Sequence, residues 1–331
     1  MDGMCLEADV MNTVITSEST DPWRNLALEE LLFTSHSEGI VLYLWQNRNT
    51  VVIGRNQNAW KECRAELLER EGGRLARRTS GGGAVFHDMG NLNFTFITPR
   101  DGYNLERQLG VILEAVRSQG VNAKFTGRND LVTAAGGKFS GNAFCFSRAK
   151  GLHHGTILVD VNMDKLSRYL APSADKLKSK GVDSVRSRVA NLRELNPAIT
   201  IDSMAAAVEA AFKAEYGECV RVDGDSLDRR RLCALEERHA SWEWRMGKTP
   251  EFNVEFNTRF SWGGIELCFR VKDGTILDTT AYSDAMDEAF IRQLPGLLTG
   301  RRLNAREMEA LSLSKNPMLA DIGRWLAEVG A

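Results

Sequence analysis

One stretch of the sequence limits the fold and the function more than any other: residues 77–96, which read RRTSGGGAVFHDMGNLNFTF. Three consecutive glycines, Gly81 to Gly83, follow two arginines and lead into an alternating apolar run, a pattern that predicts a strand interrupted by a loop with almost no side chains. Glycine tolerates positive φ, so successive backbone N–H groups of such a loop are able to turn toward one anion. Arg78 adds a planar guanidinium that suits phosphate or carboxylate.

The polar residues around this loop favour a binding site over a structural turn. For the three glycines alone, a tight turn in a β-meander is an equally good interpretation. However, Ser80 precedes the glycines, and His87, Asp88, Asn91 and Asn93 follow them on the next segment. A purely structural turn has no need for so many hydrogen-bonding groups.

A second glycine-bounded site follows later in the chain. Lys138 comes after two glycines and before Ser140-Gly141, at the start of a predicted strand. A lysine beside a turn is usually a solvated surface residue, but its pairing with the arginine–glycine loop favours a converging role. His153 and His154 are adjacent on a predicted strand and point to opposite faces, so they do not readily ligate one metal ion. One of them is expected to orient a loop by hydrogen bonding.

The length and the apolar content predict two domains. The chain has 331 residues and is 43% hydrophobic, which is too long for one ordinary domain and apolar enough for two cores. We expect a larger domain over residues 1–246, a linker at 247–250, and a small α+β domain over 251–331 with no chemistry of its own. Within the first domain, strands at 40–45 and 50–53 are expected to form a hairpin, and residues 60–71 a helix.

Composition excludes several classes of protein. The net charge of −2 argues against a general nucleic-acid binder. Six cysteines without CxxC or Cys/His spacing disfavour disulfides and zinc and fit a reducing cytoplasm, and no apolar run suits a membrane span. The basic segment 176–188 is read equally well as a solvated loop or as a segment that closes over a polyphosphate or meets an acidic partner.

Five motifs occur in a fixed order: RRTSGGGAVFHDMGNLNF, GRNDLV, GGKFSGNA, HHGTILVD and SKGVDSVRSRVANL. In this order and spacing they resemble the lipoate-protein ligases of the bacterial A type, and the resemblance extends from DPWRNLALEE at Asp21 to RFSWGGIEL in the C-terminal part. It implies an α/β (α+β) fold: a catalytic domain of the biotin/lipoate ligase type, with mixed β-sheets and packed helices, plus a small α+β C-terminal domain. The departures are a longer N-terminus and Phe139, where the family often has a smaller apolar residue.

The resemblance also implies an activity. Such an enzyme activates lipoate with ATP as lipoyl-AMP and transfers the lipoyl group to a lysine of a lipoyl domain, in E2 subunits of 2-oxoacid dehydrogenases or in the glycine cleavage H protein. Mg²⁺ is expected with ATP, and its ligands are unassigned. Lys138 is the expected catalytic residue, bridging the lipoate carboxylate and the α-phosphate, and Arg78 is expected to anchor the activated acid or its phosphate. The nucleotide is expected to lie on the backbone of Gly83, Ala84, Val85 and Phe86, the last two also walling the lipoyl tunnel. Weaker candidates are Ser80, Gly81, Gly82, His87, Asp130 and His154.

Three other functions are compatible with parts of this sequence. An octanoyltransferase of the same fold uses a cysteine nucleophile and no ATP, but this chain has Ala171-Pro172-Ser173-Ala174 where one branch carries that cysteine. Cys145, on an alternating apolar strand, reads as a core residue. A biotin ligase is disfavoured by the resemblance alone, and a non-catalytic lipoate-binding protein has no need of Lys138. The sequence leaves the choice between lipoate and octanoate open.

Overall fold

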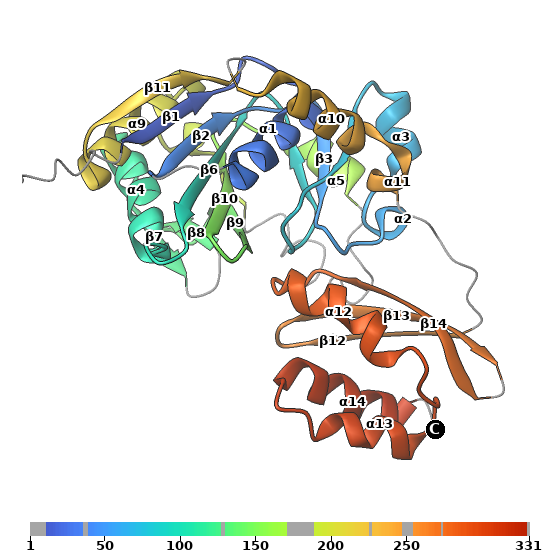
Figure 1. Cartoon of the computed structure of the whole chain (residues 1–331). Coiled ribbons are helices and arrows are strands. Elements are labelled where there is room, and N and C mark those ends of the chain that lie inside the picture. The colour runs from blue at the N-terminus through green and yellow to red at the C-terminus, as the bar shows by residue number, and fades with distance from the viewer. Residues whose placement is uncertain are drawn as a thin grey trace, which may run out of the picture.

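The computed structural model of the chain describes residues 11–35, 39–126, 130–170, 189–224, 227–246, 254–272 and 274–329. A large part with two sheets lies above a smaller C-terminal part in Figure 1. The expected linker at 247–250, the basic segment 176–188 and the stretch 171–174 lie outside the described residues. None of the helices in the described ranges combines the length and the apolarity that a membrane crossing requires.

The larger sheet has eight strands in the order β11-β1-β2-β6-β10-β9-β8-β7. The first three of these run parallel to one another, and the neighbours from β2 to β7 are antiparallel, so the sheet is mixed. The strands are β1 (Asn12–Thr16), β2 (Val41–Trp45), β6 (Asn91–Pro99), β7 (Ala123–Thr126), β8 (Asp130–Thr133), β9 (Lys138–Phe146), β10 (Lys150–Leu158) and β11 (Cys219–Asp223).

Helices cover both faces of this sheet. Helices α4 (Leu105–Ser118) and α9 (Ile201–Tyr216) pack on one face, and α1 (Pro22–Thr34) and α10 (Arg229–Ala240) lie on the other (Figure 1). The start of α1 follows from its sequence, because the Asp21 side chain accepts a hydrogen bond from the Trp23 N–H at 2.9 Å and proline occupies the first helical position. Alternate residues of each central strand therefore enter two separate cores.

A second sheet, with the order β4-β3-β5, lies beside the first. It comprises β3 (Thr50–Ile53), β4 (Arg74–Arg77) and β5 (Val85–His87), and its core includes residues of α2 (Ala59–Glu62), α3 (Ala65–Arg70) and α5 (Met163–Tyr169). The expected hairpin between β2 and β3 is wrong, because β2 pairs with β1 and β6 whereas β3 pairs with β4 and β5. Residues 60–71 form two short helices rather than one.

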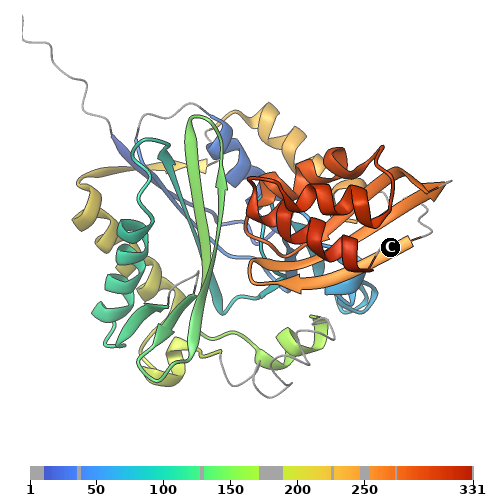
Figure 2. The same cartoon turned by 90° about the horizontal axis from the view of Figure 1, so that it is seen from below.

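The C-terminal part has its own antiparallel sheet and its own core. Strands β12 (Val254–Phe260), β13 (Gly263–Lys272) and β14 (Thr275–Ser283) are covered by α12 (Glu288–Leu298), α13 (Ala305–Ser312) and α14 (Pro317–Val329). Figure 2 shows the last helices, in red, lying across this sheet. Two short helices, α8 (Leu192–Leu195) and α11 (Trp242–Arg245), complete the larger part. The fold is therefore the mixed α/β catalytic architecture with an added α+β unit that the sequence predicts.

Candidate active site

A cavity of about 170 Å³ lies between the two sheets of the larger part. The large sheet supplies one wall, β3 and β5 supply the opposite wall, and the glycine loop and one residue of the C-terminal part close the side. The lining residues are Leu26, Trp45, Val52, Arg78, Gly82, Gly83, Ala84, Val85, His87, Asn93, Lys138, Gly141, Asn142, Ala143, His154, Gly155, Thr156 and Met286. The glycine loop and Lys138, which are separated by more than fifty positions in the sequence, thus line one cavity.

Lys138 begins β9, and its ammonium is held at the cavity wall. The Nζ atom lies 2.7 Å from Oδ1 of Asp130 on the neighbouring strand β8. The ammonium also lies over Gly141, where an added Cβ would come within 3.2 Å of Nζ. The Lys138 carbonyl accepts a hydrogen bond from the Ala190 N–H at 2.8 Å, which fixes the backbone. Asp130 does not line the cavity, so it reaches the site only through Lys138.

The two arginines before the glycine loop are buried and bind backbone carbonyls. Arg77 donates to the carbonyls of Gly54, Arg55, Gln57, Trp244 and Arg245 at 2.7–3.2 Å. Arg78 binds its own loop, because its Nη2 donates to the carbonyls of Gly81 at 2.6 Å and Gly83 at 2.8 Å. Burial lowers the pKa of each guanidinium to about 10, which leaves both charged at neutral pH. Both side chains therefore shape the loop and still carry positive charge beside the cavity.

Each of the three glycines in the loop has a different structural role. A Cβ on Gly81 would come within 2.5 Å of the Ala285 carbonyl oxygen, so the C-terminal part approaches the bare backbone here. Gly82 has φ of +90°, which other residues rarely adopt, and its N–H donates to the Ala285 carbonyl at 3.1 Å. A Cβ on Gly83 would meet no atom within 4 Å. Gly83 therefore keeps open the part of the loop that faces the cavity.

His154 ties the glycine loop to the sheet. Its Nε2 lies 2.7 Å from Ser80 Oγ, and its Nδ1 lies 2.8 Å from Oε1 of Glu29 on α1. This Ser–His–Glu order resembles a hydrolase triad, but Ser80 is fully buried, does not line the cavity and also lies 3.1 Å from the Nε donor of Arg78. The arrangement orients the loop, as expected for one of the two histidines. His153 points to the opposite face and contacts Gln108 and Asn142.

Alternation along β5 separates the predicted loop residues. Val85 and His87 face the cavity, whereas the Phe86 side chain packs into the core behind the small sheet, 5.6 Å from the Tyr169 ring between centroids. The expectation that Phe86 walls the tunnel is therefore wrong, because neighbouring residues of a strand point to opposite faces. Only the backbone of Phe86 remains close to the loop. The pKa of His87 is lowered to about 3, mainly by burial and also by the nearby Arg78 and His154, so its ring is neutral.

Several lining residues carry no local signal in the sequence. Trp45, Asn93 and Thr156 are neighbours in one row across β2, β6 and β10. Gly141 continues this row, since its N–H donates to Thr156 Oγ1 at 3.2 Å. Only the register of the sheet brings these residues together with Lys138. Met286 enters the cavity from the C-terminal part of the chain.

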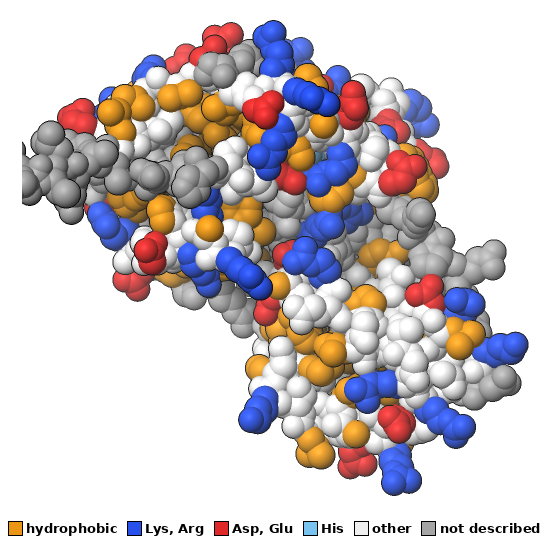
Figure 3. Space-filling view, in the orientation of Figure 1, with side chains coloured by type: hydrophobic (Ala, Val, Ile, Leu, Met, Phe, Trp, Pro, Cys, Tyr) orange, Lys and Arg blue, Asp and Glu red, His pale blue; other side chains and the backbone are white. Residues whose placement is uncertain are grey.

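Positive charge gathers where the C-terminal part meets the rest of the molecule, on the face shown in Figure 3. The Trp244 ring lies between two guanidinium groups, with Arg55 at 4.0 Å and Arg238 at 4.3 Å from its centroid. The pKa of Arg55 is lowered, mainly by burial and also by the neighbouring charges of Arg292 and Arg238, while Glu288 opposes that shift. Arg238 is paired with Glu30 and Arg55 lies near Glu288, so part of this positive charge is already balanced.

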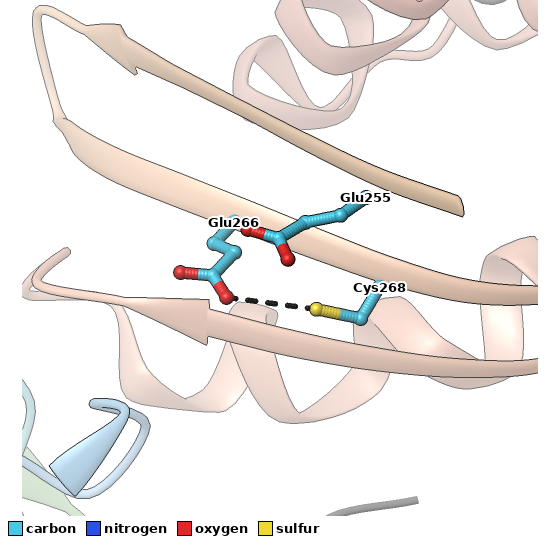
Figure 4. Close-up of side chains that lie close together, drawn as sticks. All are labelled: Glu255, Glu266 and Cys268. Carbon is cyan, nitrogen blue, oxygen red and sulfur yellow. Dashed lines mark hydrogen bonds between the residues drawn. The ribbon is translucent and has the colours of Figure 1, made fainter. Parts of the chain in front are cut away.

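The C-terminal sheet carries a small group of metal-type side chains away from the cavity. Glu255, Glu266 and Cys268 place their ligand atoms within 4.8 Å of one another (Figure 4). The Cys268 thiol already donates to Glu266 Oε1 at 3.6 Å. We therefore assign this group no metal and no chemistry.

Comparisons with known proteins identify the family of this chain. The model of the lipoyl protein ligase A/B catalytic domain matches residues 21–213, and the model of the bacterial lipoate protein ligase C-terminus matches residues 249–319. A crystal structure of Plasmodium falciparum LipL1 in complex with lipoate is 27% identical, with a TM-score of 0.83 over 96% of this chain and 99% of that chain.

Two further solved structures cover the larger part. A bipartite lipoate protein ligase from Thermoplasma acidophilum, solved in a study of that ligase and its E2 lipoyl domain, is 25% identical, with a TM-score of 0.64 over 74% of this chain and all of that one. A lipoate-protein ligase A bound with ATP is 24% identical, with a TM-score of 0.62 over 72% of this chain and 99% of that one, and shows the same fold. The chain thus belongs to the lipoyl protein ligase A/B family and is an enzyme of the lipoate-protein ligase type.

Proposed function

We propose that this enzyme attaches lipoate to protein lysines in two steps that consume ATP. In the first step a lipoate carboxylate oxygen attacks the α-phosphorus, the bond to pyrophosphate breaks, and lipoyl-AMP forms. In the second step the acceptor amine attacks the activated carbonyl, AMP leaves, and the amine loses a proton. Two solved relatives support this proposal, because one was solved in complex with lipoate and the other was solved bound with ATP.

The observation that carries the proposal is the shared cavity of Lys138 and the glycine loop. Two anions must approach each other in the first step, so their repulsion has to be offset by fixed positive groups. The Lys138 ammonium is a compact charge that suits an oxygen of each reactant. Arg78 adds charge from within the loop, and Gly83 leaves room for the nucleotide beside the backbone.

We propose that Mg²⁺ arrives with the ATP phosphates rather than in a protein cage. The carboxylates described around the cavity are engaged, Asp130 by Lys138 and Glu29 by His154. Mg²⁺ commonly keeps several waters and binds substrate phosphates with few protein ligands, so this donor set is compatible with it. Bound in this way, the ion would neutralise charge on the leaving pyrophosphate.

The acceptors proposed are lipoyl domains, namely E2 subunits of 2-oxoacid dehydrogenases and the H protein of glycine cleavage. A solved relative was studied with its E2 lipoyl domain, which supports this class of partner. We also propose a cytoplasmic location, because the cysteines in the described ranges are free thiols.

The ATP-independent transfer reaction is the alternative, and Cys145 bears on it. Such a transferase needs a reactive thiolate at the cavity. Cys145 does not line the cavity, packs against the core beside α1, and has its pKa raised to about 11, mainly by burial. The chemistry of this residue therefore favours the ATP-dependent reaction.

We further propose that the C-terminal part moves during the cycle about the segment at 247–250. The backbone of the C-terminal part is hydrogen-bonded to the larger part at two places. The Ala285 carbonyl accepts a hydrogen bond from the Gly82 N–H of the glycine loop at 3.1 Å, and the Ser283 N–H donates to the Asn56 carbonyl at 2.6 Å. A phosphate that takes the Gly82 N–H must displace the Ala285 carbonyl. Small-angle scattering of the free protein and of the protein with lipoate, Mg²⁺ and ATP is expected to differ, and identical curves would contradict the movement.

The deciding assay offers lipoate, octanoate and biotin separately with Mg²⁺ and ATP and measures pyrophosphate release. We expect release with lipoate and none with biotin, followed by modification of an isolated lipoyl domain. Replacing Lys138 by alanine is expected to abolish adenylate formation while circular dichroism stays that of the wild type. Undiminished turnover of that variant would remove Lys138 from the mechanism.

A further inference from the structure

Two side chains at the cavity wall present N–H groups that have no partner in the described part of the chain. His87 on β5 is 3% exposed and Asn93 on β6 is 1% exposed, and both line the cavity. The unpaired atoms are Nε2 of His87 and Nδ2 of Asn93. A buried donor without an acceptor is costly, so both groups call for a ligand atom that accepts hydrogen bonds.

A chain of hydrogen bonds fixes which nitrogen of His87 carries the proton. Asn25 Nδ2 donates to the backbone carbonyls of Ser19 and Gln46 at 2.9 and 2.8 Å, which sets the orientation of that amide. Asn25 Nδ2 also lies 3.0 Å from Asn47 Oδ1 and shares its two hydrogens among this oxygen and the two carbonyls, so the Asn47 amide directs its own Nδ2 toward His87 Nδ1, 3.2 Å away. The His87 Nδ1 atom is therefore the acceptor. Because the ring is neutral, its proton lies on Nε2 and faces the cavity.

The orientation of the Asn93 amide rests on a single contact with Asn91, whose own Oδ1 has no partner among the described residues. The Asn93 Oδ1 accepts a hydrogen bond from Asn91 Nδ2 at 2.8 Å, which leaves the Asn93 Nδ2 as the group available to a ligand. Asn93 is paired with Trp45 on one side and with Thr156 on the other. Apolar residues, among them Leu26, Val52 and Val85, line the same cavity together with Thr156 and His154. The cavity thus combines apolar surface with a few polar groups, the arrangement that fixes the orientation of a ligand.

The position of Asn93 relative to Lys138 suggests which part of a ligand it meets. The Lys138 ammonium lies over Gly141, and the row from Gly141 through Thr156 to Asn93 crosses two strand spacings. At about 4.8 Å for each spacing, Asn93 lies about 10 Å from Gly141 along the sheet. An acyl chain advances about 1.25 Å for each carbon–carbon bond of about 1.5 Å, so an eight-carbon acid spans roughly 9 Å. A carboxylate at Lys138 thus places carbons six to eight near Asn93.

We propose that His87 and Asn93 form a polar subsite for the far end of the acyl chain, selecting medium-chain acids that carry a hydrogen-bond acceptor at carbons six to eight. The inference rests on the proposed function, because it assumes a carboxylic acid bound at Lys138. The dithiolane sulfurs of lipoate are weak acceptors at these positions. Octanoate has only hydrogens there and leaves both donors unpaired. The subsite therefore favours lipoate over octanoate, a choice that the sequence left open.

Binding of the acids alone, without ATP, tests the subsite by calorimetry. The probes are lipoate, octanoate and 7-oxooctanoate, whose ketone is a strong acceptor and carries no donor. We expect wild-type protein to bind 7-oxooctanoate at least as tightly as octanoate, although the ketone is better hydrated in water. The ratio of the two dissociation constants is expected to shift about tenfold toward octanoate in Asn93→Leu, the effect of one net hydrogen bond to a buried donor. Lipoate, with weaker acceptors, is expected to lose a few-fold against octanoate.

Control measurements separate this inference from the proposed function. Val52→Ala changes the apolar wall and is expected to weaken all three acids alike, so that their ratios stay constant. If the wild type binds octanoate better than the ketone, or if Asn93→Leu leaves the ratio unchanged, the subsite is refuted while the ligase function stands. The wild-type comparison needs no variant, so poor folding of Asn93→Leu does not prevent a decision. If no acid binds and no pyrophosphate is released, the proposed function fails and the subsite fails with it.

Discussion

Replacing Gly141 by alanine tests the position of the Lys138 ammonium without removing it. An ideal Cβ at Gly141 lies 3.2 Å from Nζ and 3.3 Å from Cε of Lys138, and no other atom outside its immediate neighbours lies within 4 Å. Carbon contacts are most favourable near about 3.5–4.0 Å, so the ammonium must move by roughly half an ångström. The atoms that move are the end of a flexible side chain. The pair with Asp130, at 2.7 Å, moves with them.

We expect this variant to lose activity but not stability. A Gly→Ala change at a compatible position alters the free energy of unfolding by under about 1 kcal/mol, because it mainly restricts the unfolded chain. Misplacing a catalytic group by about 1 Å costs on the order of 100-fold, so half that displacement predicts a loss of about 10-fold or more in kcat/KM for adenylate formation. Pyrophosphate release at saturating ATP, with lipoate varied, measures this directly.

The cavity position of Gly141 requires a control for direct obstruction of the substrate. If the methyl group acts only through the lysine, adding Gly141→Ala to Lys138→Ala changes neither the residual rate nor the affinity for lipoate. A further loss in the double variant would mean that the methyl group blocks the acid itself. Gly110→Ala on α4 is the matched substitution elsewhere, because its Cβ meets nothing within 4 Å. Unchanged kcat/KM in Gly141→Ala would refute the role given to the ammonium position.

Two more predictions concern Gly83 and the two buried histidines with lowered pKa values. Gly83→Ala adds a Cβ with no atom within 4 Å, so we expect an unchanged melting temperature and unchanged lipoate affinity but a raised KM for ATP, and a normal KM would move the nucleotide away from this loop. His87 and His153 have pKa values lowered by burial to about 3, against about 6.5 when unfolded, so both stay neutral in the fold while the unfolded chain gains their protons. The free energy of unfolding is therefore expected to fall as the pH drops from about 6.5 toward 3, by up to about 1.4 kcal/mol per pH unit for each histidine. Urea unfolding of wild type and His153→Gln at pH 7 and pH 5 checks this, and equal pH dependence of the two proteins would contradict it.

The sequence predicted the elements whose signals are local. The N-cap and proline fix the start of α1, and the strands expected at 40–45 and 50–53 are present as Val41–Trp45 and Thr50–Ile53. The pairing of strands has no comparable local signal in the sequence. The polar turn at 46–49 is compatible with a hairpin, but β2 and β3 each find two other partners in separate sheets. Turn composition does not distinguish a hairpin from a crossing between sheets, because partner choice depends on distant strands.

The same division holds for the site. Alternation predicted that His153 and His154 separate, and the glycine motif located one wall of the cavity. Asn93 appeared among the polar residues after the loop, yet its place opposite Trp45 and Thr156 depends on three strands in register. Met286 depends on how the C-terminal part packs against the glycine loop. Neither position is encoded in the few residues on either side.

Arg77 and Arg78 lie beside the glycine loop, as the sequence predicted, but their side chains mainly bind the backbone of the protein. The pattern of two arginines before glycines predicted side chains that grip an anion, whereas most of their donors bind backbone carbonyls. Carbonyl partners satisfy hydrogen bonds without cancelling charge, and in the described ranges neither arginine has a carboxylate within ion-pair distance. At roughly 7 Å and an effective dielectric constant of about 20, one such charge still attracts an anion by about 2 kcal/mol. The buried pair therefore builds the loop and also supplies a fixed positive field, so replacing either arginine by a neutral residue is bound to disturb shape and charge together.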